Sequence, residues 1–175
     1  MNIRESIIDD IEKIRAVHLQ AFEESEAQMV ADFTVRLLQE NNPVKILSLV
    51  AVKDNKIIGH IAFSPVFLQG TQEQLGYILA PLAVLPEYQK KKVGSALIKH
   101  GIEAISRLGS LMIFVYGDPN YYSRFGFETD LARNFIPPFK LQYPDGWHAM
   151  KLTSTDIPEG GKLKCVDALH DPDLW

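Results

Sequence analysis

The chain has 175 residues, of which 46% are hydrophobic and 23% charged, and its formal net charge is −4. A chain of this length forms about one domain and can bury a sizeable core without disulfides or metal. The mildly acidic balance argues against a general nucleic-acid binder, because neutralising phosphates requires a basic face. The first residues lack the basic-then-apolar order of a signal peptide, and no apolar run approaches the ~18 residues that span a bilayer. We therefore expect a cytoplasmic protein with no membrane and no nucleic-acid partner.

The first forty residues predict a short strand and two helices. Residues 2–6 have the composition of a strand, and a helix capped by Asp9 or Asp10 is expected to run to about Phe22. A second helix is expected over about 25–40. The apolar stripe of the first helix has helical spacing and consists of Ile11, Ile14, His18, Ala21 and Phe22.

Three strands joined by short turns are expected next. Residues 46–53, 56–68 and 75–85 are rich in apolar and β-branched residues, and turn-forming residues separate them. Consecutive strands with short connections predict an antiparallel meander. Pro81 lies inside the third run, and because proline cannot donate to a strand ladder, it marks a bulge or an edge there.

A helix then connects two strands of the sheet. Apolar residues return to helical spacing over 92–108, Gly109 is placed to end the helix, and 111–116 has the composition of a buried strand. Together with 75–85 these segments predict a βαβ unit, in which the two strands are parallel.

The expected fold class is α/β: a mixed, mostly antiparallel sheet with one parallel βαβ unit and helices on both faces. The domain is expected to cover 1–154. The tail, 155–175, contains prolines and glycines and is expected to be loosely held, with one extra strand near 163–165. The elements expected between the βαβ unit and the tail are a helical turn at 119–125, a short strand at Phe127 and a strand at 147–153.

The single cysteine, Cys165, cannot form an internal disulfide. We interpret it as a small packed residue rather than a catalytic one. No metal site is expected.

Lysines at the start of the helix over 92–108 point to an anion. Lys90, Lys91 and Lys92 stand at the N-terminal end, where the helix dipole is positive and lysines are unfavourable. The conflict disappears if backbone N–H groups and lysine heads face a phosphate together. Gly94 costs about 1 kcal/mol in a helix, which close approach of a ligand to the backbone would justify. A solvated charge run and close helix packing are the alternative interpretations.

Residues 82–98 resemble the acetyl-CoA-binding segment of the GCN5-related N-acetyltransferase (GNAT) superfamily. That segment ends a strand and opens a helix with Gln/Arg-x-x-Gly-x-Gly/Ala. Gln89 corresponds to its leading residue and Gly94 to its last, whereas Lys92 stands in place of the first glycine. A lysine there must adopt the same turn, at a cost if φ is positive, or lend its ammonium to the phosphates.

A second segment, residues 117–127, carries the resemblance further. It reads Gly-Asp-Pro-Asn-Tyr-Tyr-Ser-Arg-Phe-Gly-Phe, with Tyr122 four residues before Gly126. The string is similar to that of bacterial YhbS-type N-acetyltransferases in the same superfamily. Both segments lie in the right order, with a strand, helix and strand between them.

The resemblance implies direct transfer of an acetyl group from the co-substrate acetyl-CoA to an acceptor, usually an amine. The pantetheine arm is expected to pair with the backbone of Leu82, Ala83 and Val84, and the Val84 N–H to face the thioester oxygen. The residues expected around the phosphates are Gln89, Lys90, Lys91, Lys92, Val93, Gly94 and Ser95.

For the departing thiolate, the resemblance favours the O–H of Tyr122, with Tyr121 as the competing choice, and it places Asn120 at the pantetheine. Several members of the superfamily use a glutamate of the third strand as base, but Tyr77 to Leu85 holds no acidic or histidine side chain here. His60, on a neighbouring strand, is the candidate base, directly or through water; a structural role is the alternative.

Other interpretations stay open. Three acidic residues between the first two helices either attract a cationic acceptor or are solvated surface: Glu23, Glu24 and Glu26. A CoA-binding sensor or interaction module without catalysis is the main alternative to an enzyme. A phosphate-loop nucleotide enzyme is disfavoured, because no Gly-x-x-x-x-Gly-Lys-Ser/Thr or Gly-x-Gly-x-x-Gly string follows a strand. The sequence leaves a homodimer and the identity of the acceptor open.

Overall fold

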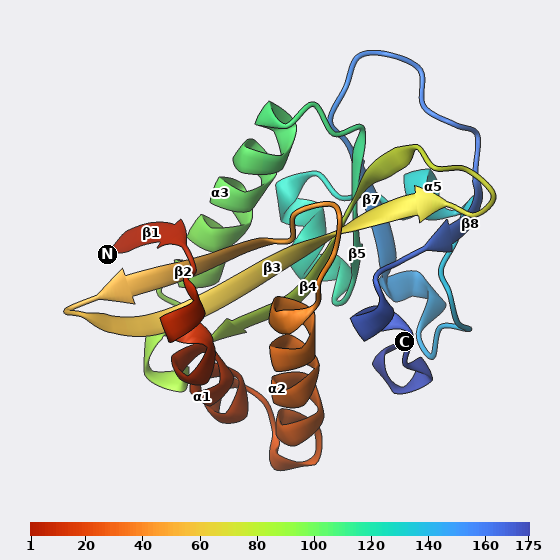
Figure 1. Cartoon of the computed structure of the whole chain (residues 1–175). Coiled ribbons are helices and arrows are strands. Elements are labelled where there is room, and N and C mark those ends of the chain that lie inside the picture. The colour runs from red at the N-terminus through yellow and green to blue at the C-terminus, as the bar shows by residue number, and fades with distance from the viewer. The chain divides into compact units, whose positions relative to one another are not determined.

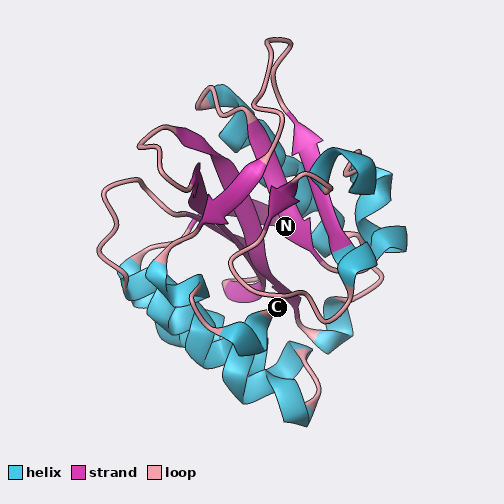
Figure 2. Ribbon diagram, turned by 90° about the vertical axis from the view of Figure 1, so that its right-hand side faces the viewer, coloured by secondary structure: helices cyan, strands magenta, loops and turns pink.

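A computed structural model describes residues 1–175, in which helices and strands both occur (Figures 1 and 2). The contacts divide the chain into two compact units. The first consists of Met1–Phe63 and Pro81–Gly101, and the second of Ser64–Ala80 and Ile102–Trp175. No helix of the chain has both the length and the apolar character needed to cross a bilayer.

The first unit is built on an antiparallel sheet. Its strands are β1 (Asn2–Glu5), β2 (Leu47–Lys53) and β3 (Lys56–Leu68), of which the part up to Phe63 belongs to this unit. Strand β2 lies between the other two, and the registers place Ile3 opposite Ala51 and Val50 opposite His60. The predicted hairpin is confirmed: Asp54 and Asn55 form its turn with positive φ, as short polar side chains tolerate.

Helices cover both faces of this sheet (Figure 1). On one face lie α1 (Ile11–Ala21) and α2 (Glu24–Gln39), and His18 of α1 contacts His60 of β3. On the other face, α3 (Val93–Arg107) begins beside Gly59, the residue before His60 in β3. A Cβ on Gly59 would come 3.1–3.2 Å from side-chain atoms of Leu97 and Val93. Glycine at this position therefore lets the first turns of α3 approach β3 closely.

The start of α1 is tied to β1 by a buried carboxylate. Asp10, 2% exposed, accepts a hydrogen bond of 2.6 Å from the Arg4 guanidinium and one of 3.0 Å from the Ile7 N–H. Asp10, one of the two predicted caps, stands at the N-cap position of α1, but its side chain makes no capping hydrogen bond to that helix and holds the strand–helix connection instead.

The second unit contains the parallel pair. Strand β4 (Gln74–Val84) is parallel to β5 (Met112–Tyr116), with Gly76 opposite Met112, and β5 is antiparallel to β7 (Trp147–Lys151). At Gly76 a Cβ would lie 2.0 Å from the Met112 carbonyl oxygen, so this pairing requires glycine. The predicted mixed sheet with one parallel βαβ unit, formed by β4, α3 and β5, is confirmed. The short elements that follow β5 are α4 (Pro119–Tyr122), α5 (Thr129–Ala132) and β6 (Phe135–Ile136).

The C-terminal segment contains the expected extra strand. Strand β8 (Gly161–Lys164) pairs with the end of β3 and with β6. The expectation of a loosely held tail is wrong, because Trp175 is only 6% exposed and its Nε1 donates to the Leu169 carbonyl at 3.0 Å. The predicted strand at Phe127 is reduced to one isolated bridge between Glu128 and Ala149.

Candidate functional site

The connection between β4 and α3 is a short loop fastened to the strand it leaves. A 3-10 turn (Pro86–Tyr88) follows β4, and the chain then extends at Gln89. The Gln89 side-chain amide donates to the Val84 carbonyl at 3.1 Å. The residue that leads the motif therefore closes the loop onto the last residue of β4.

Lys92 adopts the backbone conformation that glycine normally supplies. Its φ is +65°, and that of Lys90 is +59°, both in the left-handed region. A non-glycine residue in this region costs roughly 1–2 kcal/mol. The turn of the GNAT motif is thus made despite the substitution, and strain is stored in a loop whose three lysines are exposed.

The first turn of α3 has backbone donors that its own helix does not use. The hydrogen bond from the Ala96 N–H to the Lys92 carbonyl, 3.0 Å long, closes the first turn. The N–H groups of Val93, Gly94 and Ser95 precede it, as in any helix start. Together with the positive helix end and the exposed lysines, these donors form an arrangement that can hold phosphate oxygens.

Further basic side chains lie near the loop. The Nζ atoms of Lys53 and Lys91 are each 5.6 Å from the centre of the Tyr88 ring. The carboxylate of Glu87 pairs with Lys56 at 3.0 Å, and its own backbone and this lysine lower its pKa. The one acidic side chain of the loop is therefore engaged with a lysine of β3.

The last residues of β4 continue beyond its pairing with β5. The parallel register covers Gly76–Leu79, whereas β4 extends to Val84. Pro81, which cannot donate from its nitrogen, falls in this continuation. Leu82 and Val84 are half-buried and Ala83 between them is buried, as alternation along a strand requires.

In the second unit, residues 117–127 form a compact cradle around Tyr122. A Cβ on Gly117 would come 2.5 Å from Tyr122 Cε2, so the phenol ring lies directly against the Gly117 backbone. The ring also meets Phe127 edge-on, with centroids 5.8 Å apart, and Tyr121 at 5.1 Å. Gly117 and Phe127, the first and last residues of this segment, therefore position the Tyr122 ring.

The remaining residues of the string fix the backbone. Asp118 caps α4, its carboxylate accepting from the Asn120 N–H at 2.9 Å, and Pro119 occupies the first helical position. Gly126 ends the following 3-10 turn with φ +92°. Arg124 stacks over the Tyr121 ring at 4.6 Å.

Tyr122 keeps its proton at neutral pH. The residue is half-buried, but burial of the phenol group, with smaller contributions from Tyr121 and Asp118, raises its pKa above the ordinary value of 10. The O–H is therefore a hydrogen-bond donor throughout the neutral range. Asn120 is exposed on the same short helix.

His60 belongs to a buried network that the sequence did not reveal in full. Its Nδ1 lies 2.9 Å from His18 Nε2, and its Nε2 lies 3.0 Å from Ser48 Oγ. Ser48 Oγ in turn is 2.6 Å from Ser6 Oγ. His60 and His18 are both 0% exposed, and the hydrogen bonds of His60 lead through Ser48 to the half-buried Ser6. The signal was present in the sequence, because each histidine stands on an apolar stripe.

Burial keeps both imidazoles neutral. It lowers the pKa of His18 to about 3, and burial together with His18 lowers the pKa of His60 well below 6.5. Both ring nitrogens of His60 are already engaged. A base at His60 would therefore have to act through Ser48, and it would be a weak one.

Three other predictions concern single side chains or metal. Glu23, Glu24 and Glu26 are exposed at the start of α2, where acidic residues complement the helix dipole. Cys165 is half-buried, and burial raises the pKa of its thiol to about 12, so the thiol keeps its proton at neutral pH. No group of three or more His, Cys, Asp or Glu side chains is arranged to hold a metal ion.

The predicted site residues are thus divided between the units. The first unit holds the end of β4, the loop from Gln89 to Ser95, and His60. The second holds Asn120 and Tyr122.

The same class of protein emerges from comparison with known families and sequences. A family model described as an acetyltransferase (GNAT) domain matches residues 45–129. The chain is 36% identical over 162 residues to the uncharacterized N-acetyltransferase YjhQ of Escherichia coli strain K12, covering 90% of this chain and 88% of YjhQ. The chain therefore belongs to the GNAT family of N-acetyltransferases.

YhbS proteins, the type that residues 117–127 resemble, are among the further matches. The uncharacterized N-acetyltransferase YhbS of Escherichia coli strain K12 is 38% identical over 131 residues, which cover 73% of this chain and 74% of YhbS. A crystal structure of Escherichia coli YhbS in complex with CoA matches with a TM-score of 0.77 and 29% identity, covering 97% of this chain and 92% of that one. A GNAT family acetyltransferase from Brucella melitensis, in complex with acetyl-CoA, matches with a TM-score of 0.71 and 27% identity over 97% of both chains.

Proposed function

We propose that this chain transfers an acetyl group from acetyl-CoA to an acceptor carrying a primary amine, by direct attack in a ternary complex. The β4–α3 connection carries the proposal. Its exposed lysines, the left-handed turn at Lys92 and the N–H groups at the start of α3 suit a pyrophosphate. Solved relatives contain CoA and acetyl-CoA.

The end of β4 is the proposed seat of the thioester. The pantetheine arm pairs as a strand would with the backbone of Leu82, Ala83 and Val84. The Val84 N–H faces the thioester oxygen, which becomes an oxyanion when the amine nitrogen attacks the carbonyl carbon. One fixed N–H donor at that position contributes a few kcal/mol to the transition state.

Tyr122 is the proposed partner of the leaving sulfur. When the C–S bond breaks, the thiolate, with an ordinary pKa of about 8.5, accepts a hydrogen bond or the proton of the phenol. The raised pKa of Tyr122 ensures that the O–H is present. It also makes full proton transfer less favourable, so donation of a hydrogen bond is the main contribution. Asn120 is proposed to contact the pantetheine amide.

The attacking amine must also lose a proton. We place His60 behind Ser48, so that the serine hydroxyl receives the proton and the imidazole receives it in turn. The lowered pKa of His60 makes this acceptor weak. The same observation favours a second candidate function, a CoA-binding module without catalysis.

Thiol release separates the two functions. Purified protein is given acetyl-CoA with a panel of primary amines and with the matching alcohols, and free CoA thiol is measured. The enzyme interpretation predicts amine-dependent release above the hydrolysis background. CoA binding without release for any amine would support the non-catalytic module instead.

A further inference from the structure

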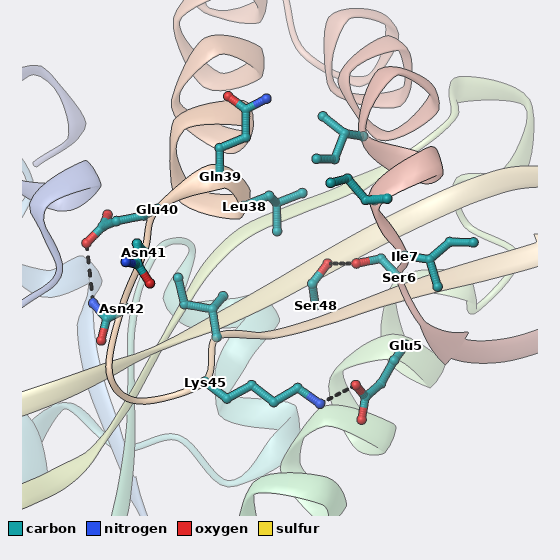
Figure 3. A pocket seen from close by; sticks show the side chains of 13 residues that line it. Glu5, Ser6, Ile7, Leu38, Gln39, Glu40, Asn41, Asn42, Lys45 and Ser48 are labelled. Atoms are coloured by element: carbon teal, nitrogen blue, oxygen red, sulfur yellow. Dashed lines mark hydrogen bonds and ion pairs between the residues drawn. The ribbon is translucent and has the colours of Figure 1, made fainter.

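We propose that His18 is a positioning residue, which holds His60 in the tautomer whose Nε2 accepts the Ser48 proton and so completes a proton relay that begins at Ser6. The inference rests on the proposed role of His60 and deepens it. All four residues belong to the first unit. The two serines line a cavity of about 510 Å³ between the end of α2 and the start of β2, where Figure 3 shows their hydrogen bond.

Strand register brings the members of the relay together. Ser48 of β2 is opposite Ala62 of β3, so His60, two residues before Ala62, projects from the same face of the sheet as Ser48. The Ser6 N–H donates to the Ser48 carbonyl at 2.9 Å, which holds the residue after β1 beside Ser48. His18 reaches the other ring nitrogen of His60 from α1, a helix that covers this face (Figure 1).

The hydroxyl hydrogens decide in which direction protons are shared. Ser6 Oγ donates to Ser48 Oγ at 2.6 Å. Because a serine hydroxyl has one hydrogen, that of Ser48 is left for His60 Nε2, 3.0 Å away. A neutral imidazole that accepts at Nε2 carries its proton at Nδ1. His60 therefore donates from Nδ1 to His18 Nε2 at 2.9 Å, and His18 carries its own proton at Nδ1.

The relay ends at His18. Its Nδ1 is buried without a hydrogen-bond partner in either tautomer, so this atom does not choose between the two directions and the serines do. A proton that reaches His60 therefore leaves only through Ser48. His18 supplies an acceptor for the Nδ1–H of His60 and no onward path, which is a positioning role rather than an acid–base role.

The relay transfers one proton between its two ends. When the acceptor amine releases its proton to Ser6, directly or through water, the Ser6 hydrogen passes to Ser48 and the Ser48 hydrogen to His60 Nε2. The amine becomes a neutral nucleophile, and His60 becomes an imidazolium held at Nδ1 by His18. Because His18 is neutral, it stabilises this imidazolium less than a carboxylate would, in agreement with the lowered pKa of His60.

The direct test is a long-range ¹H–¹⁵N correlation of the imidazole rings at pH 7, recorded without acetyl-CoA and assigned with His18→Gln. The proposal predicts that His18 and His60 are both neutral Nδ1–H tautomers. An Nε2–H tautomer at His60 would overturn it, because Nε2 would then donate to Ser48. If no amine supports thiol release, the proposed function fails, whereas this measurement still decides the tautomers.

Two substitutions of similar size separate the acceptor from packing. His18→Leu removes the acceptor, so His60 should change to the Nε2–H tautomer. With the amine that releases most thiol, kcat should fall about 10- to 100-fold, the lower range for a general base, and the KM of acetyl-CoA should stay unchanged. His18→Gln keeps an acceptor oxygen and should retain the tautomer and most of kcat.

Thr34→Val is the control for lost stability, because it removes a buried hydroxyl of α2 that bonds the Val30 carbonyl and takes no part in the relay. It should leave kcat and both tautomers unchanged. Equal kcat in His18→Leu and His18→Gln, or the same fall in Thr34→Val, would contradict the positioning role.

His18→Glu gives a readout that packing alone does not move. Burial and His18 are the influences on the pKa of His60 in the native chain. A carboxylate beside Nδ1 favours the imidazolium, so the acid limb of the kcat–pH profile should move up by about 1–3 pH units. The titration of the His60 ring, followed in the same correlation spectra, should rise with it. An acid limb that does not follow His60 would show that the relay does not carry the proton of the amine.

Discussion

His18 Nε2 lies 2.9 Å from His60 Nδ1 with both rings at 0% exposure, so two neutral imidazoles join α1 to β3 in the first unit. Their pKa values are lowered in the folded protein, that of His18 to about 3. Below about pH 6.5 the unfolded chain therefore binds protons that the native state does not. The stability that these groups contribute is fully present above pH 6.5 and is lost as the pH falls toward 3.

We accordingly predict that the free energy of unfolding, measured with urea, falls below pH 6.5 by up to about 1.4 kcal/mol per pH unit for each histidine. The Arg4–Asp10 pair lowers the pKa of Asp10 and adds to the loss only near and below pH 4. His100→Gln, at an exposed position, should leave the slope unchanged. Constant stability between pH 7 and 5 would contradict neutral burial of the pair.

Lys92→Gly should keep or tighten CoA binding, because glycine adopts φ +65° without strain. Lys91→Gly is the matched control: it removes the same charge from a residue outside the left-handed region. The difference in CoA affinity and melting temperature between the two variants measures the strain at Lys92. A tenfold greater loss of CoA affinity in Lys92→Gly than in Lys91→Gly would show instead that the Lys92 ammonium holds phosphate.

Tyr122→Phe removes the O–H and keeps the ring in its cradle. We predict a fall in kcat of about 10²- to 10³-fold, the usual effect of losing one fixed hydrogen-bond donor to a developing negative charge, with little change in CoA affinity. The defect should shrink with a thioester whose thiol is more acidic, because a better leaving group needs less assistance. Near-normal kcat, or a larger defect in Tyr121→Phe, would exclude Tyr122 from this role.

Gly117→Ala places a methyl group 2.5 Å from the present position of Tyr122 Cε2 and must displace the ring. Overpacking of this kind costs about 1–3 kcal/mol, and kcat should fall with it. In a Tyr122→Ala background the same substitution should cost much less stability, which a double-mutant cycle measures. Equal costs in both backgrounds would mean that Gly117 does not serve the tyrosine.

Periodicity and turn residues predicted most of the sheet and helices, because those signals are local. The run over 56–68 coincides with β3, and 92–108 exceeds α3 by one residue at each end. The packed tail escaped prediction because it depends on a distant contact: Trp175 meets Trp147 with ring centroids 6.0 Å apart. The prolines and glycines of residues 155–175 had predicted a loosely held tail instead.

The sequence predicted which residues belong to the candidate site, but not their conformations and contacts. The two motif segments identified Gln89–Ser95 and Tyr122 as candidates from residue order alone, and their roles stay predictions. The left-handed φ of Lys92 and the contact of Gly117 with Tyr122 needed coordinates, since neither follows from a string of letters. The engagement of His60 by His18 and Ser48 likewise depends on residues 42 and 12 positions away. The 1–154 domain boundary, a homodimer and a cytoplasmic location stay predictions.

Thermal unfolding with CoA tests the central claim, that the β4–α3 connection binds this co-substrate. At 100 times the dissociation constant a ligand adds about 2.7 kcal/mol of apparent stability, which for a chain of this size raises the melting temperature by roughly 5–10 °C. Pantetheine, which lacks the phosphates, should give a much smaller shift at equal concentration. A melting temperature unchanged by millimolar CoA, or raised as much by pantetheine, would contradict the account.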